Sequence, residues 1–498
     1  MLSSKDLSFW MACASALQPA AQAYIDGRLQ DAVDGRQFAS TCPHTGQTIA
    51  MVARCAQADV DLAVSAARRS FEAGDWSRCH PRARKPVLQK LAQLLRDNAD
   101  ELALLDCLDM GKPISDALNI DVPATAALFD WYAEACDKLY DEVAPSGPDA
   151  LALVTREPVG VVAAVIPWNF PLDMAAWKVA PALAAGNSVL LKPAEQSPLS
   201  AIRLAQLASE AGLPDGVLNV LPGYGEEAGQ ALGLHPDIDC LSFTGSTEIG
   251  KRFLAYSAAS NMKMVWLECG GKSPNLVFAD CADLDAAARK AAFGICFNQG
   301  QVCSASSRLL VESSIHDRFV EKVLTEMAHY QPGNPLDPAT RLGTLVDAGH
   351  TGRVHGFIED GVRQGACLLA GGERLRIGDS DCYLQPALFT GVTPQMRIAR
   401  EEIFGPVLSV LRFDSEAEAI AMANDSIYGL AAAVWTDQLQ RAHRVARALR
   451  AGTVSVNTVD ALDPGVPFGG CKQSGFGRDL SLHALDKFSQ LKTTWISL

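Results

Sequence analysis

Short apolar segments alternate with helix-like segments through the middle of the chain, and this alternation constrains the fold more than any other feature. Strands are expected at residues 161–166, 188–192, 217–221, 240–243 and 264–267, with helices such as 201–211 and 248–256 between them. Strands and helices that alternate in this way form βαβ units, whose parallel sheet carries helices on both faces. The pattern therefore predicts an α/β protein in which ligands bind at the carboxyl ends of the strands.

The rest of the chain indicates more than one domain, because 498 residues are too many for a single hydrophobic core. Helices are expected over 56–137, and a second series of strands and helices runs from about 275 to 456, with strands at 309–311, 407–411 and 431–435. The polar segment 137–159 resembles an extended arm. The β-prone tail 492–496 has the composition of a strand that could join the sheet edge of a partner.

Composition and charge exclude several classes of function. The net charge of −14 argues against a nucleic-acid-binding surface, which requires a basic patch. The fourteen cysteines are scattered without a CxxC pair, which indicates reduced thiols in the cytoplasm and not a disulfide scaffold. No signal-type segment opens the chain, and the longest apolar run, 159–168, is interrupted by Pro167 and is too short to span a bilayer. We therefore expect a soluble protein.

No metal site is expected from the histidines. None of the nine lies at a metal-like spacing from a cysteine. His350 and His355 are five residues apart without a carboxylate motif, so both are interpreted as ordinary helix or loop residues.

Cys303 is the strongest candidate for a chemical role. It follows an expected helix over 284–297 and ends the polar stretch Asn298-Gln299-Gly300-Gln301-Val302-Cys303. A cysteine among small and amide residues after a helix can face a pocket, where its placement sets the reactivity of the thiolate. The other cysteines lack a comparable setting. Cys303 is therefore the candidate nucleophile.

Two polar side chains beside expected strands have the chemistry that such a nucleophile needs. Asn169 lies between Pro167 and Pro171, which fix the backbone, and its amide could stabilise a developing oxyanion. Glu268 follows the 264–267 strand and precedes two glycines, where a carboxylate could act as a general base on water. Taken alone, each has a simpler interpretation, as a turn asparagine or as a solvated charge at a strand end.

A glycine-containing segment after the 240–243 strand suits a dinucleotide. Gly245 to Gly250 opens a helix, and the N-terminal amides of a helix bind pyrophosphate. The segment is not the GxGxxG fingerprint, and it departs from a P-loop because Arg252 replaces the hydroxyl residue that binds Mg²⁺. Lys192 and Glu195, at the end of another strand, could hydrogen-bond a ribose diol, and Glu195 would repel a 2′-phosphate.

Taken together, these segments resemble the aldehyde dehydrogenase family. The matching stretches are 167–171, 192–195, 243–250, 268–275, 298–303, 402–406 and 467–470, and the resemblance runs from about Tyr24 to the C-terminus. It implies a Rossmann-type parallel-sheet cofactor domain, an α/β catalytic domain and a β oligomerisation arm. The implied boundaries are 1–136 and 157–268 for the NAD-binding domain, 269–478 for the catalytic domain, and 137–156 with 479–498 for the arm.

The resemblance also implies a role for each matched residue. Cys303 would be the nucleophile, Asn169 with the Cys303 backbone amide the oxyanion hole, and Glu268 the general base. Lys178 would support proton transfer. The residues that would bind NAD are Ile166, Trp168, Lys192, Glu195, Gly225, Gly245, Ser246, Glu402 and Phe404.

The implied reaction is the NAD-dependent oxidation of an aldehyde to a carboxylic acid. Cys303 would attack the aldehyde to give a thiohemiacetal whose oxyanion Asn169 holds. Loss of hydride to the nicotinamide would leave a thioester, and water activated by Glu268 would hydrolyse it. The presence of Glu268 favours hydrolysis over transfer to coenzyme A.

The outer part of the site is expected to select the aldehyde. The run 469–485 resembles a bacterial branch that acts on γ-glutamyl-γ-aminobutyraldehyde or 4-guanidinobutyraldehyde, in polyamine and arginine breakdown. Carboxylates there would attract a cationic tail, and aromatic rings would add cation–π contact. The residues expected on the substrate path are Phe170, Trp177, Asp121, Asp460, Asp463 and Phe468.

Two alternatives stay open: a broad-specificity aliphatic aldehyde dehydrogenase, and a non-catalytic protein with the same fold. The second would have no need for Cys303, Glu268 and Asn169 together. The family usually has leucine at Cys269 and tyrosine at Cys471, so two additional thiols are expected near the site. The expected partners are a small aldehyde and further copies of the chain, as a dimer or tetramer, and neither nucleic acid nor membrane.

Overall fold

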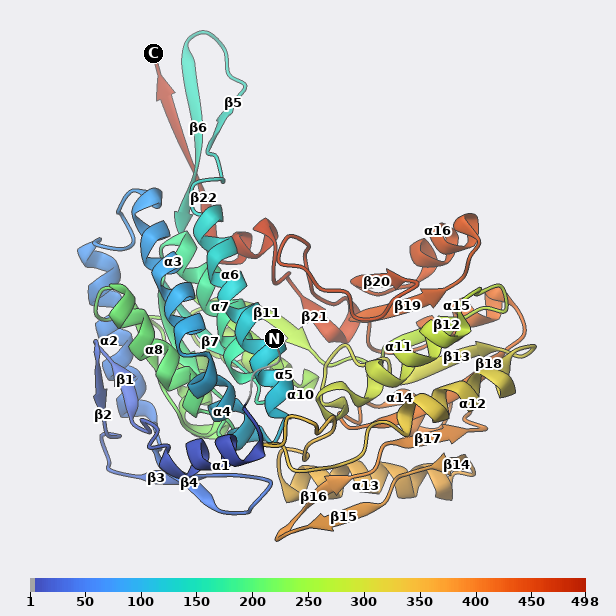
Figure 1. Cartoon of the computed structure of the whole chain (residues 1–498). Helices are drawn as coiled ribbons and strands as arrows, with labels where there is room; N and C mark the ends of the chain where they lie inside the picture. The colour runs from blue at the N-terminus through green and yellow to red at the C-terminus, as the bar shows by residue number, and fades with distance from the viewer. Residues whose placement is uncertain (1–4) are drawn as a thin grey trace.

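Two large sheets, each covered by helices, form the body of the molecule, and a long three-stranded sheet projects from it (Figure 1). The computed structural model describes residues 5–498. The first sheet belongs to the blue-to-green part of the chain, apart from the red β21 at its edge, and the second belongs to the yellow-to-red part. This arrangement confirms the expected architecture of two α/β units and a β arm.

The first sheet is parallel at its centre. Its strands are β1 (Ala23–Ile25), β2 (Arg28–Gln30), β7 (Val161–Val165), β8 (Ser188–Lys192), β9 (Leu218–Val220), β10 (Cys240–Gly245), β11 (Met264–Cys269) and β21 (Gly475–Phe476). They lie in the order β2-β1-β9-β8-β7-β10-β11-β21, and the run from β9 to β11 is parallel, as expected from the sequence. The strands β8 and β9 follow on one side of β7, and the strands β10 and β11 follow on its other side. The crevice between β7 and β10 is therefore the place where a ligand is expected.

Both faces of this sheet are buried, which explains why its strands read as continuous apolar runs. Along β7, Val161 and Val165 pack into a core with α2 (Gln57–Ala73), α9 (Gln230–Leu234) and α10 (Thr247–Ala259). The alternate residue Val162 packs into a second core with α7 (Pro171–Ala185) and α8 (Leu199–Ala211). Successive side chains of a strand point to opposite faces, so a single strand contributes to both cores.

Helices also dominate the chain ahead of β7, as expected for residues 56–137. They are α1 (Leu7–Ala16), α3 (Pro81–Asp97), α4 (Ala99–Met110), α5 (Ile114–Asp116), α6 (Val122–Ala135) and the π-helical turn η1 (Ala117–Asp121). The strands β1 and β2 and the hairpin of β3 (Gln37–Thr41) and β4 (Thr48–Ala53) lie between α1 and α2. These four short strands precede residue 56, where the sequence pattern predicted no element.

The second sheet is likewise covered by helices on both faces. Its strands are β12 (Pro274–Val277), β13 (Arg308–Glu312), β14 (Cys367–Ala370), β17 (Ala387–Thr390), β18 (Val407–Phe413), β19 (Ala431–Trp435) and β20 (Thr453–Val456), in the order β14-β17-β18-β13-β12-β19-β20. The helices α11 (Leu284–Cys296) and α12 (His316–Met327) pack on one face, and α13 (Ala348–Arg363), α15 (Glu416–Asn424) and α16 (Leu439–Ala448) on the other. Smaller elements are β15 (Arg374–Ile377), β16 (Ser380–Leu384) and α14 (Arg397–Arg400).

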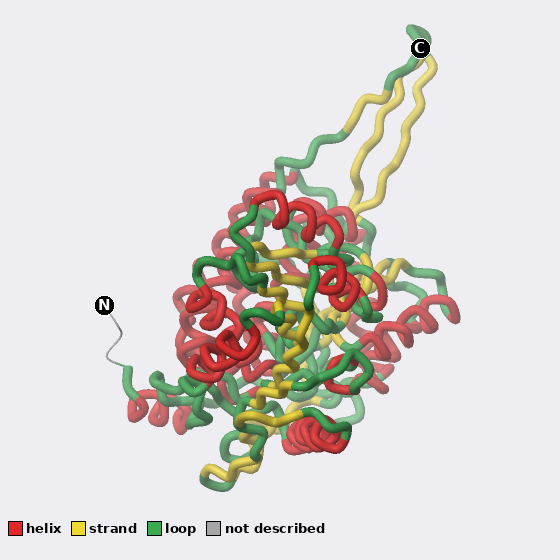
Figure 2. Tube along the Cα trace, turned by 90° about the vertical axis from the view of Figure 1, so that its right-hand side faces the viewer, coloured by secondary structure: helices red, strands yellow, loops and turns green. Residues whose placement is uncertain are grey.

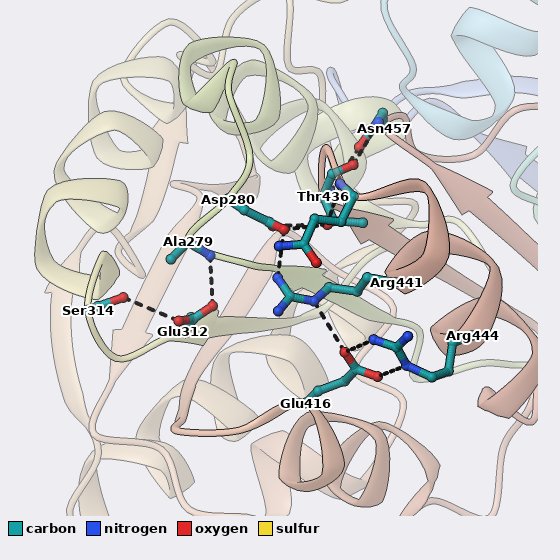
Figure 3. A network of polar contacts seen from close by, with 10 residues as sticks. Ala279, Asp280, Glu312, Ser314, Glu416, Thr436, Arg441, Arg444 and Asn457 are labelled. Atoms are coloured by element: carbon teal, nitrogen blue, oxygen red, sulfur yellow. Dashed lines mark hydrogen bonds and ion pairs between the residues drawn. The ribbon is translucent and has the colours of Figure 1, made fainter.

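The carboxyl edge of the second sheet is occupied by paired charges (Figure 3). Arg441 donates to Asp280 at 2.7 Å and to Glu416 at 3.2 Å, and Arg444 donates to Glu416 at 2.5 Å. The Thr436 backbone amide donates to the Asn457 side chain at 3.0 Å, which fixes the start of the loop after β20. These groups satisfy one another, so the edge where a parallel sheet often binds ligands is here closed by internal ion pairs.

The projecting sheet consists of β5 (Glu142–Ala144), β6 (Ala150–Pro158) and β22 (Ser489–Ser497). The strands β6 and β22 pair antiparallel along their whole length, and both views show them extending away from the body (Figures 1 and 2). The large apolar side chains of Leu491, Trp495 and Ile496 are exposed there. Within residues 5–498, no helix is long and apolar enough to cross a membrane.

Candidate active site

A cavity of about 720 Å³ brings together residues from both halves of the chain. Trp168, Asn169 and Glu268 reach it from the first sheet, at the ends of β7 and β11. Cys303 and Glu402 reach it from the second half. The catalytic residues proposed from the sequence therefore meet at the carboxyl edge of the first sheet, apart from Lys178, which lies just behind the cavity.

The backbone before Cys303 is held in an unusual conformation. After α11, the consecutive residues Asn298, Gln299 and Gly300 have φ values of 47°, 57° and 68°. A Cβ on Gly300 would lie 2.4 Å from the carbonyl carbon of Gly405, so this position has room only for glycine. The Gln301 side chain accepts from the Val346 amide at 3.1 Å. These contacts hold the half-buried thiol of Cys303 at the cavity wall.

Asn169 and the Cys303 backbone amide are arranged as a pair of donors. The Asn169 side-chain amide donates to the Gln301 carbonyl oxygen at 2.8 Å, and its second hydrogen remains for another acceptor. The carbonyl oxygen of Asn169 accepts from Asn298 at 2.8 Å, which fixes the segment. Within the described chain the Cys303 amide donates to no other group. An oxyanion formed on a carbon bound to Cys303 therefore has two donors within the same wall.

Glu268 is buried at the end of β11, and neither of its carboxylate oxygens has a hydrogen-bond partner in the described residues. Burial raises the pKa of Glu268 well above its ordinary value, and the nearby Asp479 carboxylate adds to that effect. Gly270, two residues later, leaves room for the Glu402 side chain, because a Cβ on Gly270 would lie 2.0 Å from a Glu402 oxygen. A carboxyl group in this setting has the raised proton affinity of a general base.

Lys178 belongs to a buried charge triad. Its ammonium pairs with one oxygen of Asp479, and the Lys487 ammonium pairs with the other. Burial lowers the pKa of Lys178, while burial of Asp479 is outweighed by the two lysines, which hold the pKa of Asp479 below its ordinary value. Asp479 lines the cavity, and the charges of Asp479, Lys178 and Lys487 each affect the pKa of Glu268.

The cofactor side of the cavity is built from aromatic rings. Trp168 and Phe404 meet edge to face with ring centroids 5.3 Å apart, and Phe404 adopts a φ of 61°. The His350 ring nitrogen Nε2 lies 2.7 Å from the Phe404 carbonyl oxygen. Burial lowers the pKa of His350 to about 4, so this ring is neutral and donates to the carbonyl. His350 lies in α13, in agreement with its interpretation as a helix residue, and it also lines the cavity, where it contacts Phe404.

The other cofactor candidates lie at neighbouring strand ends. Gly245, Ser246 and Glu402 line the cavity, whereas Ile166, Lys192, Glu195 and Gly225 lie outside its lining. Ile166 follows β7, and its amide donates to the Lys192 carbonyl at the end of β8. The Lys192 ammonium is 3.4 Å from a Glu195 oxygen. These residues therefore continue the carboxyl edge beyond the cavity.

The features of this edge fit a dinucleotide. Ser246 caps α10 by accepting from the Ile249 amide at 3.3 Å, which leaves other first-turn amides facing the crevice. The Thr244 hydroxyl is buried without a partner in the described residues. A Cβ on Gly225 would meet nothing within 4 Å, so there is open space at that turn. Glu402 accepts from the Gly271 amide at 3.0 Å, and burial raises its pKa to about 7.

The substrate side has aromatic walls and carboxylates. Trp177 and Phe468 meet with ring centroids 5.2 Å apart, and Phe170 lies beside them in the lining. Asp121 lines the cavity but is paired with the Lys112 ammonium, and both side chains are buried. Its charge is therefore already matched.

Asp460 and Asp463 have different surroundings. Asp460 lines the cavity beside Cys303 and accepts from the Ser304 hydroxyl at 2.7 Å. Asp463 is exposed outside the lining and accepts from the Gly465 amide at 2.7 Å, as a turn residue does. The expectation that Asp463 faces the substrate is corrected, because its carboxylate stabilises the loop instead.

The two unusual thiols are also separated by the structure. Cys269 lines the cavity, and burial raises its pKa to about 12, so the group is a protonated thiol. Cys471 lies outside the lining, where its thiol donates to the Gly429 and Arg450 carbonyl oxygens. Only Cys269 is therefore near the reacting centre.

Several cavity residues were missed by sequence analysis. Asp173 lines the substrate side from α7, and Arg353 lines the cofactor side from α13. Helical spacing could have found Asp173, because it lies one turn before Trp177 on the same helix face. No sequence signal locates Asp479 or Arg353, which arrive from distant segments.

The family model named "Aldehyde dehydrogenase family" matches residues 30–494, and the chain belongs to this family. Its relatives include the NADP/NAD-dependent aldehyde dehydrogenase PuuC of Escherichia coli, which is 55% identical over 99% of both chains. The aminoacetaldehyde dehydrogenase of Pseudomonas aeruginosa is 48% identical over 98% of both chains.

Solved structures agree closely with this fold. The γ-glutamyl-γ-aminobutyraldehyde dehydrogenase of Burkholderia cenocepacia superposes with a TM-score of 0.97 at 55% identity, covering 99% of this chain and 100% of that one. An indole-3-acetaldehyde dehydrogenase in complex with NAD⁺ superposes with a TM-score of 0.98 at 56% identity and the same coverage. Relatives at similar identity are thus named after different aldehydes. The substrate class therefore has to be inferred from the residues that line the substrate side of this cavity.

Proposed function

We propose that the protein oxidises an amino- or guanidino-aldehyde to the carboxylic acid with NAD as the cofactor. The observation that carries this proposal is the convergence of Cys303, Asn169 and Glu268 on one cavity whose other end holds carboxylates among aromatic rings. The names of the relatives, which include aminoacetaldehyde and γ-glutamyl-γ-aminobutyraldehyde dehydrogenases, support the same substrate class. 4-Guanidinobutyraldehyde and γ-glutamyl-γ-aminobutyraldehyde are the foremost candidates, in polyamine and arginine breakdown.

The reaction begins with activation of the Cys303 thiol. Burial raises the pKa of Cys303, and the Asp460, Glu402 and Glu268 carboxylates raise it further, so the resting group is a protonated thiol. Glu268, with its raised pKa, accepts that proton as the sulfur attacks the aldehyde carbon. Asn169 and the Cys303 amide donate to the oxygen of the adduct.

Bound NAD supplies the acceptor for the hydride that leaves the adduct in the oxidation step. The product on the enzyme is a thioester of Cys303. Glu268 first releases the thiol proton to solvent. It then removes a proton from water as the hydroxyl adds to the thioester carbonyl, and it returns that proton to the Cys303 sulfur as the sulfur leaves. The Lys178 and Lys487 ammonium groups stabilise the ionised form of Glu268 during this step and oppose the Asp479 carboxylate, because both lysines lower the pKa of Glu268.

The residues that would hold NAD are those at the carboxyl edge of the first sheet. Lys192 and Glu195 would bind the adenosine ribose, with Gly225, Gly245 and Ser246 along the crevice. Ile166 and Trp168 would line its floor. Glu402 and Phe404 would bind the nicotinamide riboside. Glu195 would disfavour NADP through repulsion of its 2′-phosphate.

We further propose that the chain works as a homo-oligomer in the cytoplasm, a dimer or tetramer built through the projecting sheet. Exposed apolar side chains on β22 support the assembly. All fourteen cysteines are free, which suits a reducing compartment. The proposed division is residues 1–136 and 157–268 for NAD binding, 269–478 for catalysis, and 137–156 with 479–498 for assembly.

The test is a kcat/KM panel with NAD over 4-guanidinobutyraldehyde, γ-glutamyl-γ-aminobutyraldehyde and hexanal. We expect the first two to be preferred by at least about tenfold, because their polar or charged tails meet carboxylates. A preference for hexanal would favour the broad-specificity aliphatic alternative, which the aromatic walls alone would support. Absence of NADH formation with every aldehyde would refute the activity.

A further inference from the structure

The geometry points to Asp173 as the residue that selects a cationic tail in the substrate cavity. This inference deepens the proposed function and rests on it for the identity of the cavity. It differs from the sequence-based expectation, which assigned that role to Asp121, Asp460 and Asp463. In the structure, Asp121 is paired with Lys112, Asp463 lies outside the cavity, and Asp460 lies beside Cys303 at the reacting end.

The position of Asp173 is set by α7. Pro171 occupies the first turn of the helix, so Asp173 lies in that turn and projects into the cavity lining. The neighbouring lining residues on the same helix, Met174 and Trp177, are apolar or aromatic. Asp173 is therefore a carboxylate inside an otherwise apolar wall, on the same cavity as Cys303.

The charge of Asp173 is not matched by a cation of the described chain, although the Trp177 side chain donates a hydrogen bond to this carboxylate. Lys112 is fully engaged: its ammonium pairs with Asp121 and lies 4.2 Å from the centre of the Phe170 ring. Within residues 5–498, no cationic side chain forms an ion pair with Asp173. A carboxylate removed from bulk water without a cation is costly, and a ligand cation would offset that cost.

The other candidates differ from Asp173 in pairing or in position. Asp121 is paired with Lys112, and Asp460 accepts from the Ser304 hydroxyl at 2.7 Å, next to Cys303. Asp463 lies outside the cavity. Asp173 thus provides the charge, and the rings of Phe170 and Trp177 provide faces for cation–π contact. An ammonium, quaternary ammonium or guanidinium group can pair with the carboxylate and can lie over an aromatic ring as a cation, whereas a neutral tail can do neither.

The decisive test compares a cationic aldehyde with its uncharged isostere. 4-(Trimethylammonio)butanal and 5,5-dimethylhexanal have the same shape and differ in the charge at one atom. In Asp173→Asn we expect the KM of the cationic aldehyde to rise by about tenfold or more, with kcat unchanged. The KM of the neutral aldehyde stays the same or falls. Asp379→Asn, an exposed acid in the turn between β15 and β16, is the matched control and changes neither.

An equal change in KM for both aldehydes, or no change for the cationic one, overturns the role of Asp173. Unchanged turnover of 5,5-dimethylhexanal and an unchanged melting temperature show that the variant folds. If the wild-type enzyme oxidises neither aldehyde, the proposed function is refuted. A binding measurement then tests the role of Asp173 by itself. Butyltrimethylammonium binding, measured by calorimetry, is expected to weaken about tenfold in Asp173→Asn, and equal binding overturns the inference.

The pH dependence gives an independent readout. Burial and the Asp121 carboxylate raise the pKa of Asp173 to about 7, while Lys112 and a hydrogen bond from Trp177 oppose them and Asp106 adds slightly to them. The carboxylate is ionised above that pKa. The ratio of kcat/KM for the cationic aldehyde to that for the neutral one therefore rises about tenfold from about pH 6 to about pH 8. In Asp173→Asn the ratio is flat, and a rise that persists in the variant contradicts the assignment.

Discussion

At the scale of single residues, the site depends on burial to set proton affinities. Cys303 and Glu268 face the same cavity, and burial raises the pKa of both groups. A neutral Cys303 thiol beside the Glu268 carboxylate avoids the repulsion of a thiolate and a carboxylate in a low-dielectric site. The proton moves only when an electrophile arrives, so the nucleophile is protected until substrate binds.

Cys303→Ala removes the sulfur that forms the covalent adduct. We expect NADH formation to fall below detection, because no other cavity thiol is activated. NAD binding, measured by fluorescence titration, should be retained because the cofactor residues are untouched. Aldehyde-dependent NADH formation in the purified variant would disprove the covalent scheme.

Glu268→Gln removes the base without changing its shape. Hydrolysis of the thioester should slow by about 10² to 10⁴, giving a stoichiometric burst of NADH and then little turnover. The base works only when ionised, so the wild-type rate rises as pH increases through the raised pKa of Glu268 and is lost below it. The variant should lack this limb in a pH profile of kcat. A variant with a full-speed steady state and the same limb would exclude Glu268 as the base.

Asp460→Ala tests a carboxylate with two possible effects. Loss of its charge should raise the KM of amino- and guanidino-aldehydes more than that of a neutral aldehyde. Loss of its hydrogen bond with Ser304, next to Cys303, should lower kcat for every aldehyde. Asp463→Ala is the control and should leave both parameters unchanged, because that carboxylate lies outside the cavity. Equal KM changes for charged and neutral aldehydes would limit Asp460 to the structural role.

At the scale of elements, the reactive cysteine depends on an irregular segment between regular ones. The helix α11 delivers the chain to residue 296, and three left-handed residues then redirect it to Cys303. Such conformations are costly for side chains other than glycine and persist only where the surroundings impose them. The contacts with Gly405 and Val346 provide those surroundings.

Gly300→Ala tests this element against a matched glycine. Its Cβ would overlap the Gly405 backbone as well as strain a φ of 68°, so the Cys303 loop must shift. We expect kcat to fall by about tenfold or more, since a displacement near 1 Å has that effect on positioned groups. Gly365→Ala, with a φ of 93° and nothing within 4 Å of its Cβ, should lose only about 1–2 kcal/mol of stability and keep its kcat. Equal kcat values in the two variants would mean that the loop tolerates the shift.

At the scale of the whole molecule, the projecting sheet pairs with no other sheet of residues 5–498. The strand β22 pairs with β6 on one side, and its large side chains are exposed. Isolated ribbons of this kind are marginal in water, so a second copy is the expected source of burial.

Removal of residues 489–498 tests that assembly. The truncated chain should have the mass of a smaller species, because β6 loses its neighbour and the exposed apolar surface of β22 is gone. Light scattering coupled to gel filtration measures this mass against the full chain at equal concentration. NAD binding should survive, since the cavity lies in the body. An unchanged mass would place the interface elsewhere.

The architecture and the core chemistry could be predicted from the sequence because both leave local signals. The period of apolar residues located β7, β8 and β19 to within a residue, since strands buried on both faces are continuous apolar runs. Cys303 follows an expected helix, and Glu268 follows an expected strand. These settings predicted where the two residues lie, because the carboxyl ends of parallel strands share one edge.

The sequence by itself therefore determined the fold class and the family and predicted the reacting groups, all from short-range patterns. Only the tertiary structure decided which acids face the substrate. Asp121 is matched by Lys112, Asp463 turns out to solvent, and Asp173 is left unpaired in the wall. The physical reason is that the charge of a carboxylate depends on its burial and its neighbours, and distant segments such as those bearing Lys178 and Asp479 become neighbours only through folding.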